Sequence, residues 1–132
     1  MPERKQVKMP SSAPTRFEAE LERLRLRFVK GLNARISEIE SAFADFNAGT
    51  SRSEALTRIF FEAHSLVGIA PSFGYGNIGK QALAVEEVVK RELKASADST
   101  KPDELKHAVM ALLNILKSSA QSRVALLPTN GE

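Results

Sequence analysis

The stretch from Ile59 to Gly79, IFFEAHSLVGIAPSFGYGNIG, decides how the rest of the chain is interpreted. It begins as a helical run that contains a histidine, meets a proline, and passes through a glycine-rich turn into a second helical run. Apolar residues recur here at the steps of a core-facing helix: Leu56, Ile59, Phe60, Ala63, Leu66, Val67 and Ala70. Three polar residues fall on the opposite side and are expected to face water: Arg58, Glu62 and Ser65. The helix should end at or before Ala70, because Pro71 follows.

His64 lies at the border of this apolar stripe, about a quarter-turn from its centre. Thr57, Phe61 and Gly68 share its side of the helix. A mid-helix glycine costs about 1 kcal/mol relative to alanine, which suggests that something approaches closely at Gly68. Neutral imidazole is a nucleophile that can carry a covalent intermediate. We therefore predict His64 as the reactive residue and the other three as docking neighbours, with Phe61 as the apolar contact. The same spacing also fits a half-buried histidine beside a glycine that packs against a crossing helix.

Length and composition favour one globular domain. The chain has 132 residues, of which 42% are hydrophobic, and it has no cysteine. The lack of cysteine excludes disulfides, thiolate metal sites and cysteine nucleophiles. No apolar run approaches the roughly 20 residues that span a bilayer, and the N-terminal segment lacks the hydrophobic stretch of a secretory signal. We therefore expect no membrane insertion and a cytoplasmic protein.

The positive charge is confined to the N-terminal segment. Residues 1–16 carry four basic residues and one acidic residue, which accounts for the whole net charge of +3. A basic tail can bind nucleic acid or anionic lipid. This one has three prolines and no aromatic residue, so the simpler interpretation is a disordered, solvated leader with no nucleic-acid partner. The predicted organisation is a tail over residues 1–16, a helical domain over 17–125 and a C-terminal tail over 126–132.

The first half of the domain shows one long apolar stripe. Its members recur at steps of three or four over about thirty residues: Phe17, Leu21, Leu24, Phe28, Leu32, Ile36, Ile39, Phe43 and Phe46. Gly31 and Asn33 stand in its middle and allow a bend. Asn47–Ala48–Gly49 provides a C-terminal stop. The sequence from Ser51 to Glu54 matches a capping box, which would begin the His64 helix.

Two further helices follow the glycine-rich turn. One is expected from about Asn77 to Ala95, and its predicted buried residues are Ile78, Ala82, Val85, Val89 and Leu93. The other begins near Pro102 and continues toward Val124. No stretch alternates with the two-residue period of a strand. We therefore predict an all-α fold, an antiparallel up-down four-helix bundle whose long first helix bends.

Few residues in the chain could support other chemistry. The two histidines, His64 and His107, fall on different predicted helices without a second ligand at metal-binding spacing, so we predict no metal site. His107 is interpreted as structural or merely exposed. The segment GYGNIG at residues 74–79 has the spacing of a dinucleotide turn but lacks the preceding strand. A Ser-His-Asp triad stays open, although no GxSxG motif is present.

The histidine-centred residues resemble a known family. The run AHSLVG at residues 63–68, a glycine ten residues after the histidine, and an amphipathic helix that reaches Glu86 are similar to the histidine phosphotransfer (HPt) domain. The family pattern reads A-H-x-L-K-G. The run from Leu26 to Glu40 also looks like the first long helix of such domains, so that the resemblance covers roughly residues 17–124.

The resemblance implies a phosphocarrier in a two-component phosphorelay. His64 would accept a phosphoryl group from an aspartyl phosphate of a receiver domain and pass it to another receiver, and some members instead take it from a sensor or hybrid histidine kinase. Such a domain is not an enzyme and holds no cofactor, because the receiver brings the Mg²⁺. We expect a monomer. Val67 replaces the lysine that the family usually has before Gly68, and Lys80 could instead support the phosphoryl charge.

Two other functions compete with phosphotransfer. The first is a bundle that binds a signalling partner through Phe61 and the exposed part of the His64 helix, without phosphoryl chemistry. The second is a nucleic-acid or membrane-surface binder that uses the basic tail and the basic residues from Arg23 to Lys30. The balanced charge of residues 17–132 disfavours the second.

Overall fold

The computed structural model describes residues 15–126, and every regular element in that range is helical. The elements in chain order are α1 (Arg16–Lys30), α2 (Leu32–Ala48), α3 (Arg52–Ile69), η2 (Ala70–Phe73), α4 (Gly76–Lys94), η3 (Ala97–Ser99) and α5 (Pro102–Leu126), where η marks a short 3₁₀ helix. The predicted tails fall largely outside the described residues. Thr15 and Arg16, placed in the N-terminal tail, form the cap and first residue of α1.

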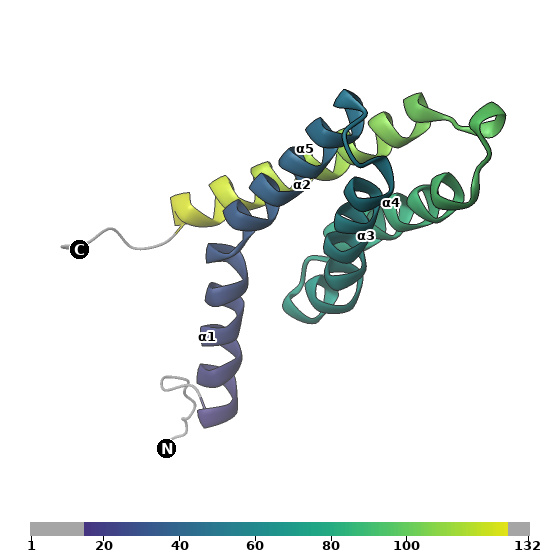
Figure 1. Ribbon diagram of the computed structural model, residues 1–132. Coiled ribbons are helices and arrows are strands. Elements are labelled where there is room, and N and C mark those ends of the chain that lie inside the picture. The colour runs from purple at the N-terminus through teal and green to yellow at the C-terminus, as the bar shows by residue number, and fades with distance from the viewer. Residues whose placement is uncertain (1–14, 127–132) are drawn as a thin grey trace, which may run out of the picture.

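Helices α2 to α5 form the predicted antiparallel four-helix bundle (Figure 1). Each of them packs against the next, and α2 also packs against α5, which closes the bundle. The shared core consists of aliphatic and aromatic side chains from all four helices, among them Leu32, Ile39, Leu56, Ile59, Leu66, Ile78, Val85, Val89, Leu105, Val109, Leu112 and Leu116. The periodicity of the apolar residues thus predicted the fold class correctly.

The first long helix is bent, as predicted, and the break falls at Gly31 between α1 and α2. The predicted continuous buried stripe is correct only from Phe28 onward. Phe17 is 74% exposed and Leu24 is 39% exposed. The bend turns α1 away from the bundle (Figure 1), so its apolar stripe has no bundle helix beside most of its length.

The turn before α3 differs from the prediction at Ser51. Gly49 ends α2 in the left-handed conformation, at φ 77°, which confirms the predicted stop. Ser51 is also left-handed, at φ 49° and ψ 59°, and its side chain makes no capping hydrogen bond. An N-cap side chain reaches the helix only from an extended backbone, so the capping box predicted for Ser51–Glu54 does not form. Thr15 and Glu18 form one at the start of α1 instead.

The connection from α3 to α4 is tight. α3 ends at Ile69, within the predicted limit, and Pro71 lies in η2. A Cβ atom on Gly79 would lie 2.8 Å from Cγ of Pro71, so the start of α4 needs a glycine there to pack on this turn.

The last turns of α4 bury a residue that sequence reasoning did not predict. Leu93, predicted as buried, is 40% exposed, whereas the neighbouring Glu92 is 3% exposed. The Glu92 carboxylate accepts hydrogen bonds from Arg52 at 2.8 Å and from the backbone N–H of Lys101 at 2.7 Å. These bonds join the start of α3 and the segment before α5 to α4, which explains why a charged side chain takes the inner position.

Candidate functional site

His64 lies on the exposed side of α3, with 64% of its side chain accessible. Its ring stacks on Phe60, one turn earlier in the helix, with ring centroids 5.5 Å apart and planes 10° apart. Phe60 is itself packed against the core. One face of the imidazole therefore packs on the Phe60 ring, while much of its surface stays open to solvent.

A buried carboxylate on α4 contacts the histidine. Oε2 of Glu86 lies 3.3 Å from Nδ1 of His64, and the Glu86 side chain is only 8% exposed. A carboxylate accepts hydrogen bonds, so Nδ1 of a neutral imidazole carries the proton and Nε2 keeps its lone pair. The contact therefore selects the tautomer whose nucleophilic nitrogen is Nε2, on the far side of the ring from Glu86.

The second oxygen of Glu86 is unusual. Oε1 is buried and has no hydrogen-bond partner within residues 15–126. Lys90, one turn further along α4, lies 3.8 Å from Oε2 through its Nζ atom and 3.5 Å from Oε2 of Glu87. A buried oxygen without a hydrogen-bond partner lowers the stability of the fold, so keeping the Glu86 carboxylate beside the imidazole costs folding free energy.

The predicted docking neighbours surround His64 on α3. Phe61 is 64% exposed. A Cβ atom on Gly68 would meet nothing within 4 Å, so the surface beside the imidazole is open. The Thr57 hydroxyl donates to the backbone oxygen of Ser53 at 2.9 Å, so its proton is already used in a hydrogen bond within α3. The alternative of a half-buried histidine beside a packing glycine is wrong, because Gly79, and not Gly68, is the glycine against which the chain packs.

Lys80 is exposed on α4 but lies six residues before Glu86, about 9 Å along the helix axis. Val67 is half-buried against the core. Of Lys80 and Lys90, Lys90 is therefore the cation close to the Glu86–His64 pair.

Sequence reasoning missed Glu86, Phe60 and Lys90 as site residues. The available signal was that Glu86 continues the apolar stripe of α4, four residues after Ala82, where a charged residue needs a reason.

The opposite edge of α3 is fixed to α2 by ion pairs, although Arg58 and Glu62 were predicted to face water. Arg58 bonds Glu38 and Asp45, each at 2.8 Å, and Glu62 bonds Arg35 at 3.0 Å. The hydrogen bond from Arg58 holds the pKa of Glu38 below its ordinary value. These bonds fix the helix that carries His64.

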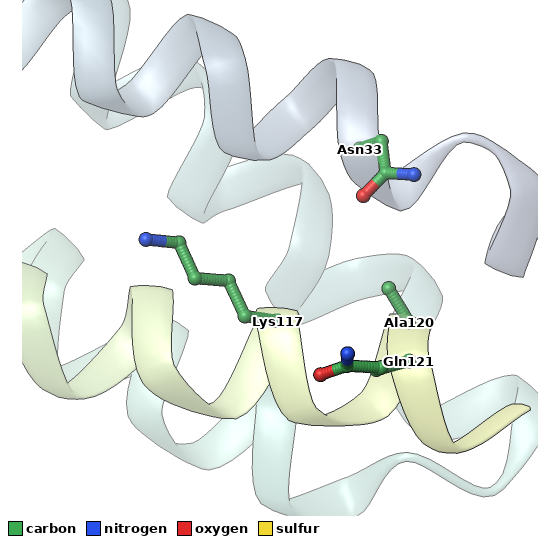
Figure 2. Close-up of a pocket in the computed structure, with 4 residues that line it drawn as sticks. All are labelled: Asn33, Lys117, Ala120 and Gln121. Atoms are coloured by element: carbon green, nitrogen blue, oxygen red, sulfur yellow. The ribbon is translucent and has the colours of Figure 1, made fainter.

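Other surfaces of the described chain offer less chemistry. A hollow of about 410 Å³ lies between the start of α2 and the end of α5, around Asn33, Lys117 and Gln121 (Figure 2). Lys117 already pairs with Glu40 at 2.8 Å. His107 is exposed on α5. Within residues 15–126 no group of three or more His, Asp or Glu side chains could hold a metal ion, and no helix combines the length and hydropathy that a membrane crossing requires.

The site is thus an exposed imidazole on the surface of an all-helical bundle, in contact with a buried carboxylate. The family model of the Hpt domain matches residues 12–121, and the chain therefore belongs to the Hpt domain family. Hpt domains are phosphocarrier modules, not catalysts, and act with receiver domains and kinases in two-component phosphorelays. Comparisons with curated proteins and with solved structures found no match.

Proposed function

We propose that this chain carries a phosphoryl group on His64 between receiver-domain aspartates of a phosphorelay. The observation that carries the proposal is the contact between Nδ1 of His64 and the buried Glu86 carboxylate, on a ring that is 64% exposed. The contact leaves Nε2 as the nucleophile and turns it toward an approaching partner.

The transfer itself is a displacement at phosphorus. The Nε2 lone pair forms the new N–P bond as the P–O bond to the receiver aspartate breaks, and the aspartate leaves as a free carboxylate. The imidazole gains positive charge in this step, and Glu86, hydrogen-bonded to the Nδ1 proton, offsets that charge. Donation to a second receiver reverses the same bonds. The carrier needs no metal or cofactor of its own, since Mg²⁺ on the receiver compensates the phosphoryl oxygens.

The charge beside the phosphoryl group comes from α4 in this proposal. The family usually has lysine at the position of Val67. Lys90, close to Glu86, is the better placed substitute, and Lys80 stays a prediction as a second, more distant cation. Glu86 and Glu87 partly neutralise Lys90, so the phosphorylated state should be less well compensated than in a domain with a lysine on α3 itself.

Receiver docking would use the surface that surrounds His64. Phe61 provides an exposed apolar contact, Gly68 provides clearance for the acidic pocket, and Thr57 extends the same side of α3. All these residues come from one chain, so one copy suffices for transfer. Receiver domains are the proposed partners, a sensor or hybrid histidine kinase is the other proposed donor, and the cytoplasm is the proposed location.

The test is phosphorylation of the full chain by a phosphorylated receiver with Mg²⁺, read on a phosphate-affinity gel under neutral conditions. We expect label on the wild type and on His107→Gln, and none on His64→Gln. Label that survives in His64→Gln, or wild type that stays unlabelled across a panel of receivers and kinases, would overturn the proposal. An unlabelled chain that still binds a receiver through Phe61 would favour the interaction module instead.

A further inference from the structure

Among the described residues, most of the apolar stripe of α1 has no bundle helix packed along it, because the bend at Gly31 turns α1 away from the bundle. The members of this stripe are Phe17, which is 74% exposed, Leu21, which is half-buried, Leu24, which is 39% exposed, and Phe28, which is 7% exposed. Phe28 is covered because it packs on Phe73 and Tyr75, with centroids 5.5 and 5.6 Å apart. We call these four residues the α1 seam. The helix that carries them extends from the bundle (Figure 1).

The α1 seam has the spacing of a coiled coil. Its residues are separated by four, three and four positions, the d-a-d-a order of a heptad repeat. If a second copy of α1 lies antiparallel on the first, Phe17 of one copy comes opposite Phe28 of the other, and Leu21 comes opposite Leu24. The pairing is the same from both sides, so a twofold axis between residues 22 and 23 relates the copies and closes the assembly as a dimer.

The charges beside the α1 seam fit this antiparallel arrangement. Glu20 and Arg27 follow the same edge of the seam, and in an antiparallel pair these edge positions face each other across the two helices. Each Glu20 would therefore meet Arg27 of the second copy. Arg27 is exposed and makes no ion pair within residues 15–126, and Glu20 is engaged only by the exposed Arg23 of its own helix at 2.8 Å. On the other edge, Glu18 would face Arg25, which already bonds Glu22 and the backbone oxygen of Phe73.

The antiparallel register places Phe17 of the second copy next to an apolar hollow of the first copy. A space of about 400 Å³ lies between α1 and the end of α3, and Leu24, Phe28, Ile69 and Phe73 form its apolar lining. Phe17 of the second copy, opposite Phe28, would enter this hollow. Ile69, which is 37% exposed, would be covered in the same step.

We propose that two copies of this chain associate through the α1 seam as an antiparallel dimer, with Phe17 of each copy inserted beside Phe28 and Ile69 of the other. Sequence reasoning expected a monomer, and the exposed seam is what changes that expectation. The dimer goes beyond the phosphotransfer function and does not depend on it. Ile69 and His64 are five residues apart on α3, about 140° around the helix, so His64 stays accessible in each copy.

The mass of the full chain in solution, measured by sedimentation or light scattering over about 1–100 µM, tests the proposal. We expect a concentration-dependent dimer. Phe17→Asp should give a monomer with unchanged helix content, because Phe17 is exposed in the single copy. Phe61→Asp, at another exposed phenylalanine outside the seam, is the matched control and should leave the dimer intact.

Charge reversal tests the register. Glu20→Arg and Arg27→Glu should each weaken the dimer about tenfold by placing like charges opposite each other. An equimolar mixture of the two variants should form a heterodimer of wild-type strength, since both facing pairs become attractive again. In a parallel dimer Glu20 would face Arg25, and Arg27→Glu would have no effect.

A wild-type chain that is monomeric at every concentration would overturn the proposal, as would a dimer that Phe17→Asp leaves unchanged. A chain that dimerises only after residues 1–13 are deleted would also overturn it and would assign the hollow to the chain's own N-terminal segment.

Discussion

The two polar edges of α3 differ in how completely their charges are paired. On the edge toward α2, Arg58 bonds both Glu38 and Asp45, and Glu62 bonds Arg35. Every charged group there has an opposite charge within 3.0 Å, and the side chains are partly exposed, so water also helps to solvate them. Such pairs contribute modestly to stability and mainly fix the relative position of the two helices.

On the edge toward α4, the charge is held differently. Glu86 is buried, its Oε1 atom has no partner among the described residues, and its closest contact is the exposed His64. A bundle built for stability alone would place an apolar residue in this position of the stripe. The contrast indicates that the ion pairs on the α2 edge serve the fold. On the α4 edge, a carboxylate that lowers stability is kept in contact with the imidazole.

The largest effect should come from removing that carboxylate. In Glu86→Ala, we expect the rate of phosphoryl transfer from a phosphorylated receiver to His64 to fall at least about tenfold, since the Nδ1 proton loses its acceptor and the developing positive charge its counter-charge. Glu86→Gln should fall between wild type and Glu86→Ala, because the amide oxygen still accepts the hydrogen bond. Rapid-quench phosphorylation assays measure these rates.

The matched control is on the other edge. Glu62→Ala should lower the melting temperature without changing the transfer rate by more than about twofold, because Glu62 only joins α3 to α2. If Glu62→Ala and Glu86→Ala slowed transfer equally, both would act through the stability of α3, and the distinction between the two edges would be lost.

The sequence predicted most of the bundle but only part of the site. Periodicity identifies which face of a helix is apolar, so the buried sides of α2 to α5 were predicted correctly except at the end of α4, where Leu93 is exposed and Glu92 is buried. It does not say what covers that face, and therefore it could not show that the stripe at Phe17 and Leu24 lies outside the bundle. The exposure of His64 could be predicted from its border position. The position of Glu86 inside the apolar stripe was a signal, but its contact with His64 could not be predicted, since that depends on how α3 and α4 pack.

An intermediate effect should separate the two glycines near the end of α3. Gly79→Ala should destabilise the chain by about 1–3 kcal/mol, because its Cβ atom would lie 2.8 Å from Pro71 and η2 must shift. Gly68→Ala should instead stabilise it by up to about 1 kcal/mol, since the site is open and alanine favours the helix. Urea unfolding at pH 7 gives both values.

The same pair of variants also separates fold from docking. The Gly68→Ala methyl group stands beside His64 where an acidic pocket must approach, so transfer should slow although the protein is more stable. Gly79→Ala should transfer at the wild-type rate wherever it is fully folded. A faster or unchanged transfer in Gly68→Ala would show that the clearance beside the imidazole has no role.

The smallest predicted effect is the pH dependence of stability at the edge of α3 that pairs with α2. The pKa of Glu38 is lowered in the folded chain, chiefly by the Arg58 hydrogen bond. The carboxylate therefore adds stability above its ordinary pKa of 4.5, and this contribution disappears as the pH falls through the lowered folded value. Glu38→Gln should reduce the melting temperature by a few degrees at most near pH 7, because the pair is exposed, and the difference from wild type should shrink below about pH 5. In an Arg58→Met background the substitution should have almost no effect at any pH. If the difference in melting temperature grew on acidification, the folded chain would favour the protonated form of Glu38. This would contradict the prediction, because the ion pair with Arg58 favours the carboxylate.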